Sequence, residues 1–459
     1  MGVRPRWSLL ALLAGLVVAV VVAALVVVDR RPRSDSAPPA ATGAPTSATT
    51  ATASLDESFY GNRTPYVVPS TPSPAGPAGF EPVFLQHLGR HGARTSIPGD
   101  HGERARELWR RASAKGALTP LGVRLGPVLD ALDAATRRLG SGRLTAVGRD
   151  EQEGLGRRAG TRLATLWTSA GGDEVDVVTS GRTRAEQSAK SFVAGLDEVR
   201  PGLHVEGPRT DERLLSFDST DPAYRAFLSS DRTWRTPYAE AVRDTDLRAA
   251  ARTVLERLYA PSFVASLDEP LAEAESLYEA YRSAPSLAAD LRTPVDMSPY
   301  FPPDAAAAFA FVEDARYFYS RGPGTAGDHR AHEAAQVLVD DFLDNAARRL
   351  AGGRTLAVLQ LAHAEEVAPL AALLELPGSR PLGSAQQLYG WSDSDFRTAS
   401  VIPLSATIDW TVWRDAAGAV LVSVAHDEVP TTLGRGCRTA DADPGYYSLE
   451  ELRRCLVPR

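Results

Sequence analysis

The chain has 459 residues and a formal net charge of −7, so it is long enough to bury a large core and carries no global basic field. This charge balance excludes binding to nucleic acid or anionic lipid through overall charge. Any anion site must be a local cluster of cations. Arginine must supply that cluster, because Lys115 and Lys190 are the only lysines.

The first residues predict an export segment rather than a folded domain. Residues 7–28 form an almost unbroken apolar run that is long enough to span a bilayer. We interpret residues 1–28 as an uncleaved membrane anchor, because no small-x-small cleavage site follows the run directly; a cleaved signal peptide is the alternative. Residues 29–79 are rich in Ala, Pro, Ser and Thr and predict a disordered linker outside the cytoplasm.

The first predicted strand, Pro82 to Leu88, leads into the motif Arg90-His91-Gly92-Ala93-Arg94. Arginine binds phosphate oxygens through a planar fork that stays charged, and a neutral imidazole is a competent nucleophile near neutral pH. Gly92 permits a sharp turn or a close approach of backbone. The motif predicts phosphoryl transfer through a phosphohistidine at His91, and a basic surface loop is the structural alternative.

Two further strands end in polar tips. Residues 174–179 lead into a segment that contains Arg182 and Arg184, and residues 355–361 lead into His363-Ala364-Glu365. Helical patterns follow directly at 185–196 and 366–374. Repeated strand, polar tip and helix is typical of an open α/β sheet with its ligand site at the carboxyl ends of the strands.

The rest of the chain completes the expected architecture. A hairpin is predicted from strands over 406–413 and 419–425, and helices are predicted over 238–259, 267–284, 305–319 and 330–350. We therefore expect an α/β fold with a central mixed sheet flanked by helices, formed by residues 80–205 and 346–459. Residues 206–345 are interpreted as an inserted helical cap, with the site in the cleft between the two parts.

Phosphoryl transfer needs cations on the phosphoryl oxygens, an in-line nucleophile and a proton for the leaving oxygen. His91 can be the nucleophile, His363 can contact the phosphoryl group, and Glu365 can be the general acid. The last role requires a raised pKa, which the neighbouring Glu366 and a polyanionic ligand would favour. Three arginines at the tips can hold the phosphate: Arg90, Arg94 and Arg184.

Each candidate also has a structural interpretation when taken alone. Arg184 could be a surface helix residue, His363 a buried histidine, and Glu365 a carboxylate near a helix N-terminus. Their joint occurrence at three strand tips favours catalysis. A second group, His426-Asp427-Glu428, follows the hairpin and is assigned a structural role. The histidine spacing fits no helical zinc site, so we expect neither a metal nor a cofactor.

Cys437 and Cys455 are the only cysteines. In an exported chain, two cysteines near the C-terminus favour one disulfide bond over a metal site, with two free thiols as the alternative. The bond would hold the C-terminal segment in place.

These motifs resemble those of the histidine acid phosphatases, branch 2 of the histidine phosphatase superfamily, and especially the multiple inositol polyphosphate phosphatases. The segment Arg90 to Arg94 is similar to the family's nucleophile motif. Residues 180–192 resemble the segment of the third arginine, in the register of Arg184 rather than Arg182. The sequence His363-Ala364-Glu365 is the form found in this subgroup.

The resemblance covers residues 59 to 459. Phe59 to Tyr66 is similar to the subgroup's N-terminal signature, and Glu313-Asp314 with Arg321-Gly322-Pro323-Gly324 is similar to a cap segment. One departure is Ser96, which stands where the family usually has proline; here the proline is Pro98. This departure puts the conformation of the loop in doubt but does not touch the chemistry directly.

The resemblance implies a phosphoglycerate-mutase-like fold and a covalent phosphohistidine at His91. It further implies that Glu365 protonates the leaving alkoxide and that the phosphate is held by four side chains, Arg90, Arg94, Arg184 and His363. The expected enzyme is a monomer without cofactor that hydrolyses inositol polyphosphates such as phytate. A broad acid phosphatase and a non-catalytic phosphate-binding protein on the same fold are the alternatives.

Overall fold

The computed structural model describes residues 59–70, 76–97, 102–168, 173–440 and 445–457. All of them belong to one compact unit, Leu55–Arg459. The expected anchor or signal segment, 1–28, lies outside the described residues, as does most of the expected linker. Within the described part of the chain, no helix combines the length and the hydropathy that crossing a bilayer requires.

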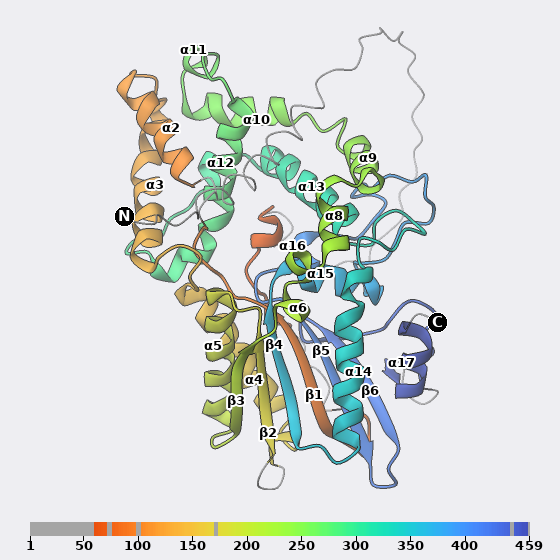
Figure 1. Ribbon diagram of the computed structural model, residues 1–459. Helices are drawn as coiled ribbons and strands as arrows, with labels where there is room; N and C mark the ends of the chain where they lie inside the picture. Colours follow the sequence, from red (N-terminus) through yellow and green to blue (C-terminus); the bar gives the residue numbers. More distant parts are fainter. Residues whose placement is uncertain (1–58, 71–75, 98–101, 169–172, 441–444, 458–459) are drawn as a thin grey trace, which may run out of the picture. The chain divides into compact units, whose positions relative to one another are not determined.

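The core of the fold is an eight-stranded mixed sheet (Figure 1). Its strands β3, β2, β4 and β1 are parallel, and β5 joins β1 in antiparallel register to start the expected hairpin with β6. In spatial order the strands are β3 (His204–Thr210), β2 (Glu174–Thr179), β4 (Thr355–Ala362), β1 (Phe80–Arg90), β5 (Thr407–Asp415), β6 (Val420–His426) and β7 (Val429–Thr431), with β8 (Tyr446–Tyr447) paired to β6. The predicted mixed α/β fold is confirmed.

Helices cover both faces of the sheet because alternate strand residues point to opposite sides. Phe84 and Leu88 of β1 pack in one cluster with α14 and α15, whereas Leu85 packs in another with α4 and α5. The helices that flank the sheet are α4 (Ala146–Arg162), α5 (Thr183–Val199), α14 (Gln336–Leu350), α15 (Ala364–Leu373) and α17 (Leu449–Leu456).

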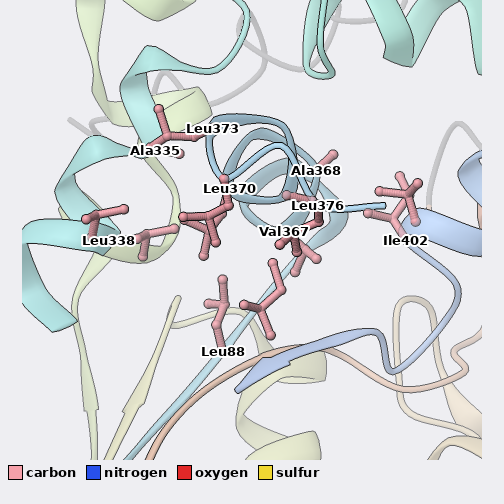
Figure 2. Close-up of a cluster of buried hydrophobic side chains, with 14 of the residues drawn as sticks. Leu88, Ala335, Leu338, Val367, Ala368, Leu370, Leu373, Leu376 and Ile402 are labelled. Atoms are coloured by element: carbon pink, nitrogen blue, oxygen red, sulfur yellow. The ribbon is translucent and has the colours of Figure 1, made fainter. Parts of the chain in front are cut away.

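The helix α15 begins at the third polar tip, directly after His363. Its apolar residues Val367 and Leu370 lie against Leu88 of β1 and Leu338 of α14 in the cluster of Figure 2. These side chains are almost completely buried. Their packing fixes the helix axis and therefore the position of the residues in its first turn.

The helical layer differs from the expected cap. Helices α2 and α3, which precede the second strand, share a hydrophobic core with the later cap helices, and Figure 1 shows them together at the end of the sheet where the parallel strands finish. The members of this layer are α2 (Gly102–Ala114), α3 (Pro120–Leu139), α10 (Leu247–Leu258), α11 (Pro261–Val264), α12 (Pro270–Ser283) and α13 (Pro303–Ser320). Helices that are distant in sequence can share one core. The expected cap range, 206–345, therefore leaves out α2 and α3, which belong to the same helical layer.

Other boundaries also differ from the expectations. The helix expected over 238–259 is broken, because α9 (Arg232–Ala241) ends before Asp246 starts α10 by accepting a hydrogen bond from the Ala249 amide. The strand β3 crosses the expected domain boundary at residue 205. The remaining short helices are η1 (Gly61–Arg63), η2 (Leu166–Thr168), α6 (Glu212–Leu215), α7 (Phe217–Thr220), α8 (Pro222–Ser230), η3 (Pro285–Asp290), η4 (Ser298–Tyr300), η5 (Glu333–Ala335) and α16 (Thr398–Val401).

Residues 59–66, which fall within the expected linker of residues 29–79, are folded. Arg63 is buried and its guanidinium donates to Glu279 Oε1 of α12 at 2.8 Å. The ring of Phe59 stacks on Trp391 with 5.8 Å between centroids. The folded part therefore begins before the expected boundary at residue 79. The buried charge of Arg63 requires a partner inside the fold, and Glu279 is that partner.

The expected disulfide is present between Cys437 and Cys455. The two residues are 18 positions apart, and a loop of this size stabilises a fold by about 3 kcal/mol in the chain-entropy model. We expect the double variant Cys437→Ser/Cys455→Ser to lose about this amount of unfolding free energy, measured by urea denaturation. An unchanged unfolding free energy would mean that burial of Leu452 and Leu456 alone holds α17 in place.

Candidate functional site

The parallel register brings the three polar tips to one edge of the sheet. Arg90 at the end of β1 lies opposite Ala362 of β4, and Thr179 of β2 lies opposite Leu361. The amide of His91 donates to the Ala362 carbonyl at 3.0 Å. The residues that follow the strands therefore meet at the carboxyl edge, as the α/β pattern predicts.

His91 lies at the centre of this edge and is 3% exposed. Its Nδ1 atom lies 2.9 Å from the Gly92 carbonyl oxygen and must carry the proton, because a carbonyl can only accept. The lone pair is then on Nε2. Burial and the positive charges of Arg184 and Arg90 hold the pKa of His91 well below 6.5, so the imidazole is neutral.

The loop after His91 is shaped by a close approach of two backbones. A Cβ atom on Gly92 would lie 2.6 Å from the Gly148 carbonyl oxygen of α4, so no larger residue fits at this position. The Gly92 amide donates to Ser188 of α5 at 3.0 Å, and the Ala93 amide donates to Glu151 of α4 at 2.9 Å. The close approach expected at Gly92 is thus to a helix of the same chain.

Arg90 is held by two backbone carbonyls that are far from it in sequence. Its Nη1 atom donates to the Asn62 carbonyl at 2.6 Å and also to the Ile402 carbonyl. Its Nε atom is buried without a hydrogen-bond partner among the described residues. Burial lowers the pKa of Arg90 to about 10, which leaves the guanidinium charged at neutral pH.

The other two predicted arginines approach the same histidine. Arg94 donates to the Thr95 carbonyl at 2.9 Å and is 9% exposed. Arg184 stands in the first turn of α5, and its Nε atom is buried without a partner in the described part of the chain. Arg182 is exposed instead. The positive charges of Arg94 and Arg184 both act on His91, in agreement with the preferred register.

His363 precedes α15 and lies beside His91, with 5.4 Å between ring centroids. Its Nε2 atom is 2.8 Å from Ser180 Oγ, and its Nδ1 atom is buried with no partner in the described residues. Burial and Arg184 lower the pKa of His363 to about 3. His363 is therefore a neutral imidazole in the ligand-free site, and it can contact a phosphoryl group through a hydrogen bond rather than as a cation.

Glu365 also reaches this edge, where its Oε1 atom accepts a hydrogen bond from Tyr317 Oη at 3.2 Å. Burial raises the pKa of Glu365, but Arg321, His363 and Arg90 outweigh it and bring the value down to about 2. The expectation of a raised pKa is therefore wrong for the ligand-free site. Glu366 does not oppose this effect, because burial raises its own pKa well above the ordinary value and keeps it neutral.

Several residues of the site were not among the predicted ones. Tyr317 and Arg321 come from the end of α13 and the residue after it, Ser180 follows β2, and Asn62 belongs to η1. The signal that could have found them is the similarity of their segments to subgroup motifs. Chemistry alone does not single them out, since each acts through a contact with a distant part of the chain.

The second histidine–carboxylate group has the structural surroundings expected of it. His426 Nε2 lies 2.9 Å from the Val401 carbonyl, and Asp427 accepts from the Thr407 amide at 2.8 Å.

Among the described residues, Glu174, His204 and Glu206 are close enough to share a cation. They lie at the beginning of β2 and β3, at the opposite edge of the sheet from His91.

The fold and the site together define an α/β protein with a neutral histidine, surrounded by arginines, at the carboxyl edge of its parallel strands. The family model described as histidine phosphatase superfamily (branch 2) matches residues 83–428. The chain belongs to this family. A comparison with curated proteins found no match.

Solved structures agree with this assignment. The multiple inositol polyphosphate phosphatase of Bifidobacterium longum in complex with inositol hexasulfate is 25% identical with a TM-score of 0.77, over 87% of this chain and 97% of that chain. Its apo form gives a TM-score of 0.78 at the same identity and coverage. The phytase from D. castellii, at 15% identity and a TM-score of 0.62 over 87% and 85% of the two chains, shares the fold.

Proposed function

We propose that this protein is a phosphomonoesterase that uses His91 as its nucleophile. The observation that carries the proposal is the state of His91, a buried neutral imidazole with its proton on Nδ1, beside Arg90, Arg94 and Arg184. A lone pair on Nε2 can attack phosphorus, and the guanidiniums can neutralise the equatorial oxygens.

The reaction then has two steps. In the first, His91 Nε2 forms a bond to phosphorus, the bond from phosphorus to the ester oxygen breaks, and Glu365 gives its proton to the leaving alkoxide. In the second, water attacks the phosphohistidine and loses a proton to the Glu365 carboxylate, which breaks the P–N bond and restores His91. Phosphate is held by Arg90, Arg94, Arg184 and His363.

The low pKa of Glu365 in the ligand-free site fits this scheme once the ligand charge is considered. Arg90 and Arg321 favour the carboxylate form of Glu365. A bound phosphate ester places negative charge among the cations of the site, and this charge favours the protonated form. Glu365 therefore gains its proton when substrate binds, and kcat falls as pH rises through the pKa of Glu365 in the complex.

We further propose that the substrates are inositol polyphosphates such as phytate. The supporting observation is the complex of the Bifidobacterium longum phosphatase with inositol hexasulfate, at 25% identity. A broad-specificity acid phosphatase is the second candidate, since the same nucleophile and arginines suit any phosphate monoester. A non-catalytic phosphate-binding protein would require the nucleophile or acid to be missing, and both are present.

The substrate proposal is tested by mass-resolved product analysis on phytate and on a simple aryl phosphate. We expect stepwise phosphate loss from phytate, with a kcat/KM for phytate well above that for the aryl ester. Equal values would favour the broad acid phosphatase. Phosphate binding without release from either ester would contradict the enzymatic proposal and favour the binding protein.

The place of action is also a proposal. We propose that the body lies outside the cytoplasm, either anchored by residues 1–28 or secreted, and acts as a monomer. The disulfide between Cys437 and Cys455 supports this, because such bonds persist in oxidising compartments.

A further inference from the structure

A chain of hydrogen bonds connects the N-terminal segment to the general acid. Asn62 Nδ2 donates to Tyr317 Oη at 3.2 Å, and Tyr317 Oη donates to Glu365 Oε1, also at 3.2 Å. Tyr317 is 4% exposed. The direction is fixed, because an amide NH₂ can only donate and the phenol has a single proton to pass on.

Asn62 contacts the phosphate-binding side of the site as well. The backbone carbonyl of Asn62 accepts from Arg90 Nη1 at 2.6 Å, and its backbone N–H donates to Glu313 Oε2 of α13 at 3.1 Å. One residue thus links the guanidinium beside the nucleophile to the hydroxyl beside the general acid.

The segment that carries Asn62 is fixed by buried ion pairs. Arg63 donates to Glu279 at 2.8 Å, and Arg282 bridges Glu279 at 2.5 Å and Glu313 at 2.7 Å. A Cβ atom on Gly61, which has a φ of 55°, would lie 2.0 Å from Glu313 Oε2. These contacts leave the backbone of Asn62 a single position.

We propose that Tyr317, held by Asn62, is the positioning residue of the general acid. Its hydroxyl donates a hydrogen bond to Glu365 Oε1, so that Oε2 is the oxygen that carries the proton for the leaving group. This inference rests on the proposed function and adds two residues to it. Neither Tyr317 nor Asn62 needs to touch the reacting atoms.

The groups around Glu365 keep the Tyr317 hydroxyl protonated, so that it acts as a hydrogen-bond donor. Burial and the Glu365 charge raise the pKa of Tyr317 to about 12, so the phenol keeps its proton and remains a donor. A donor to a carboxylate stabilises the charged form and lowers its pKa. The other titratable or charged groups that act on Glu365 are Arg321, His363, Arg90, Arg184, Glu366, Asp218 and Tyr224.

The test is the variant Tyr317→Phe, which removes only the hydroxyl. Single-turnover rates at saturating substrate should fall about tenfold or more for inositol phosphates and far less for an activated aryl phosphate. Without this donor the pKa of Glu365 in the complex rises. The pH above which the rate declines should therefore be higher by about one pH unit. A purely structural role would not move the pH profile.

Tyr278→Phe is the matched control. The Tyr278 hydroxyl donates to the Phe59 carbonyl at 2.7 Å, so this variant loosens the same N-terminal segment without touching Glu365. It should leave the pH profile where it is. Asn62→Ala should show a weaker form of the Tyr317→Phe effect, and none in the Tyr317→Phe background, since Asn62 acts through that hydroxyl.

The outcomes separate this inference from the proposed function. If the wild-type protein releases phosphate while Tyr317→Phe matches Tyr278→Phe in pH profile and in leaving-group dependence, the positioning role is overturned and the phosphatase stands. Equal losses on both esters would likewise overturn it. If the wild-type protein releases no phosphate from either ester, the proposed function fails and this inference fails with it.

Discussion

Replacing His91 with alanine is expected to lower turnover of every phosphate ester by about 10⁴-fold or more, because the nucleophile is lost while the arginines remain. Phosphate should still bind, since Arg90, Arg94 and Arg184 keep their positions. The measurement is phosphate release with both phytate and an aryl phosphate, together with phosphate binding by calorimetry.

His204→Ala provides the control for this variant. His204 is exposed and stands at the beginning of β3, away from the carboxyl edge, so its loss should leave turnover unchanged. Undiminished turnover in His91→Ala would contradict a phosphohistidine mechanism and would mean that His91 is not the nucleophile.

The variant Glu365→Gln should separate esters by their leaving groups. Gln keeps an oxygen that accepts from Tyr317 but carries no transferable proton, so phosphorylation of His91 by inositol phosphates should slow by about 10²–10⁴-fold. An aryl phosphate needs little proton transfer and should still give a rapid burst of phenolate. Turnover after the burst should be slow, because the same variant lacks the base for hydrolysis of the phosphohistidine.

Glu366→Gln is the matched control on the neighbouring residue. Glu366 is buried and neutral, and it accepts from the His363 amide at 3.1 Å, which an amide oxygen can also do. Any loss in this variant should be equal for both esters. Equal losses in Glu365→Gln, without a burst, would remove Glu365 from the role of general acid.

The strand tips were predictable because the relevant signals are local. Buried parallel strands read as apolar runs, and the residues that follow them must lie at one edge of the sheet. The strand pattern alone predicts that His91 and His363 lie together, and the 5.4 Å between their ring centroids agrees with this prediction. The choice of Arg184 over Arg182 followed from the resemblance of residues 180–192 to the family's third-arginine segment, and Arg182 is exposed in the structure.

Other features could not be predicted from local signals. Helices α2 and α3 precede the second strand, yet they pack with helices of the expected cap, because apolar helix faces associate wherever a complementary surface lies. Asn62 and Tyr317 carry no chemistry that marks them as site residues. Their contacts with Arg90 and Glu365 exist only because segments distant in sequence meet.

The sequence by itself determined which chemical groups stand at the strand ends, where the five strands β1, β2, β4, β5 and β6 lie, and which two cysteines could pair. Only the tertiary structure decided how those groups ionise. Glu366 was expected to raise the pKa of Glu365, but Arg321 and Arg90 lower it to about 2 in the ligand-free site. Ionisation depends on burial and on charges brought close by folding, and neither is set by neighbours along the chain.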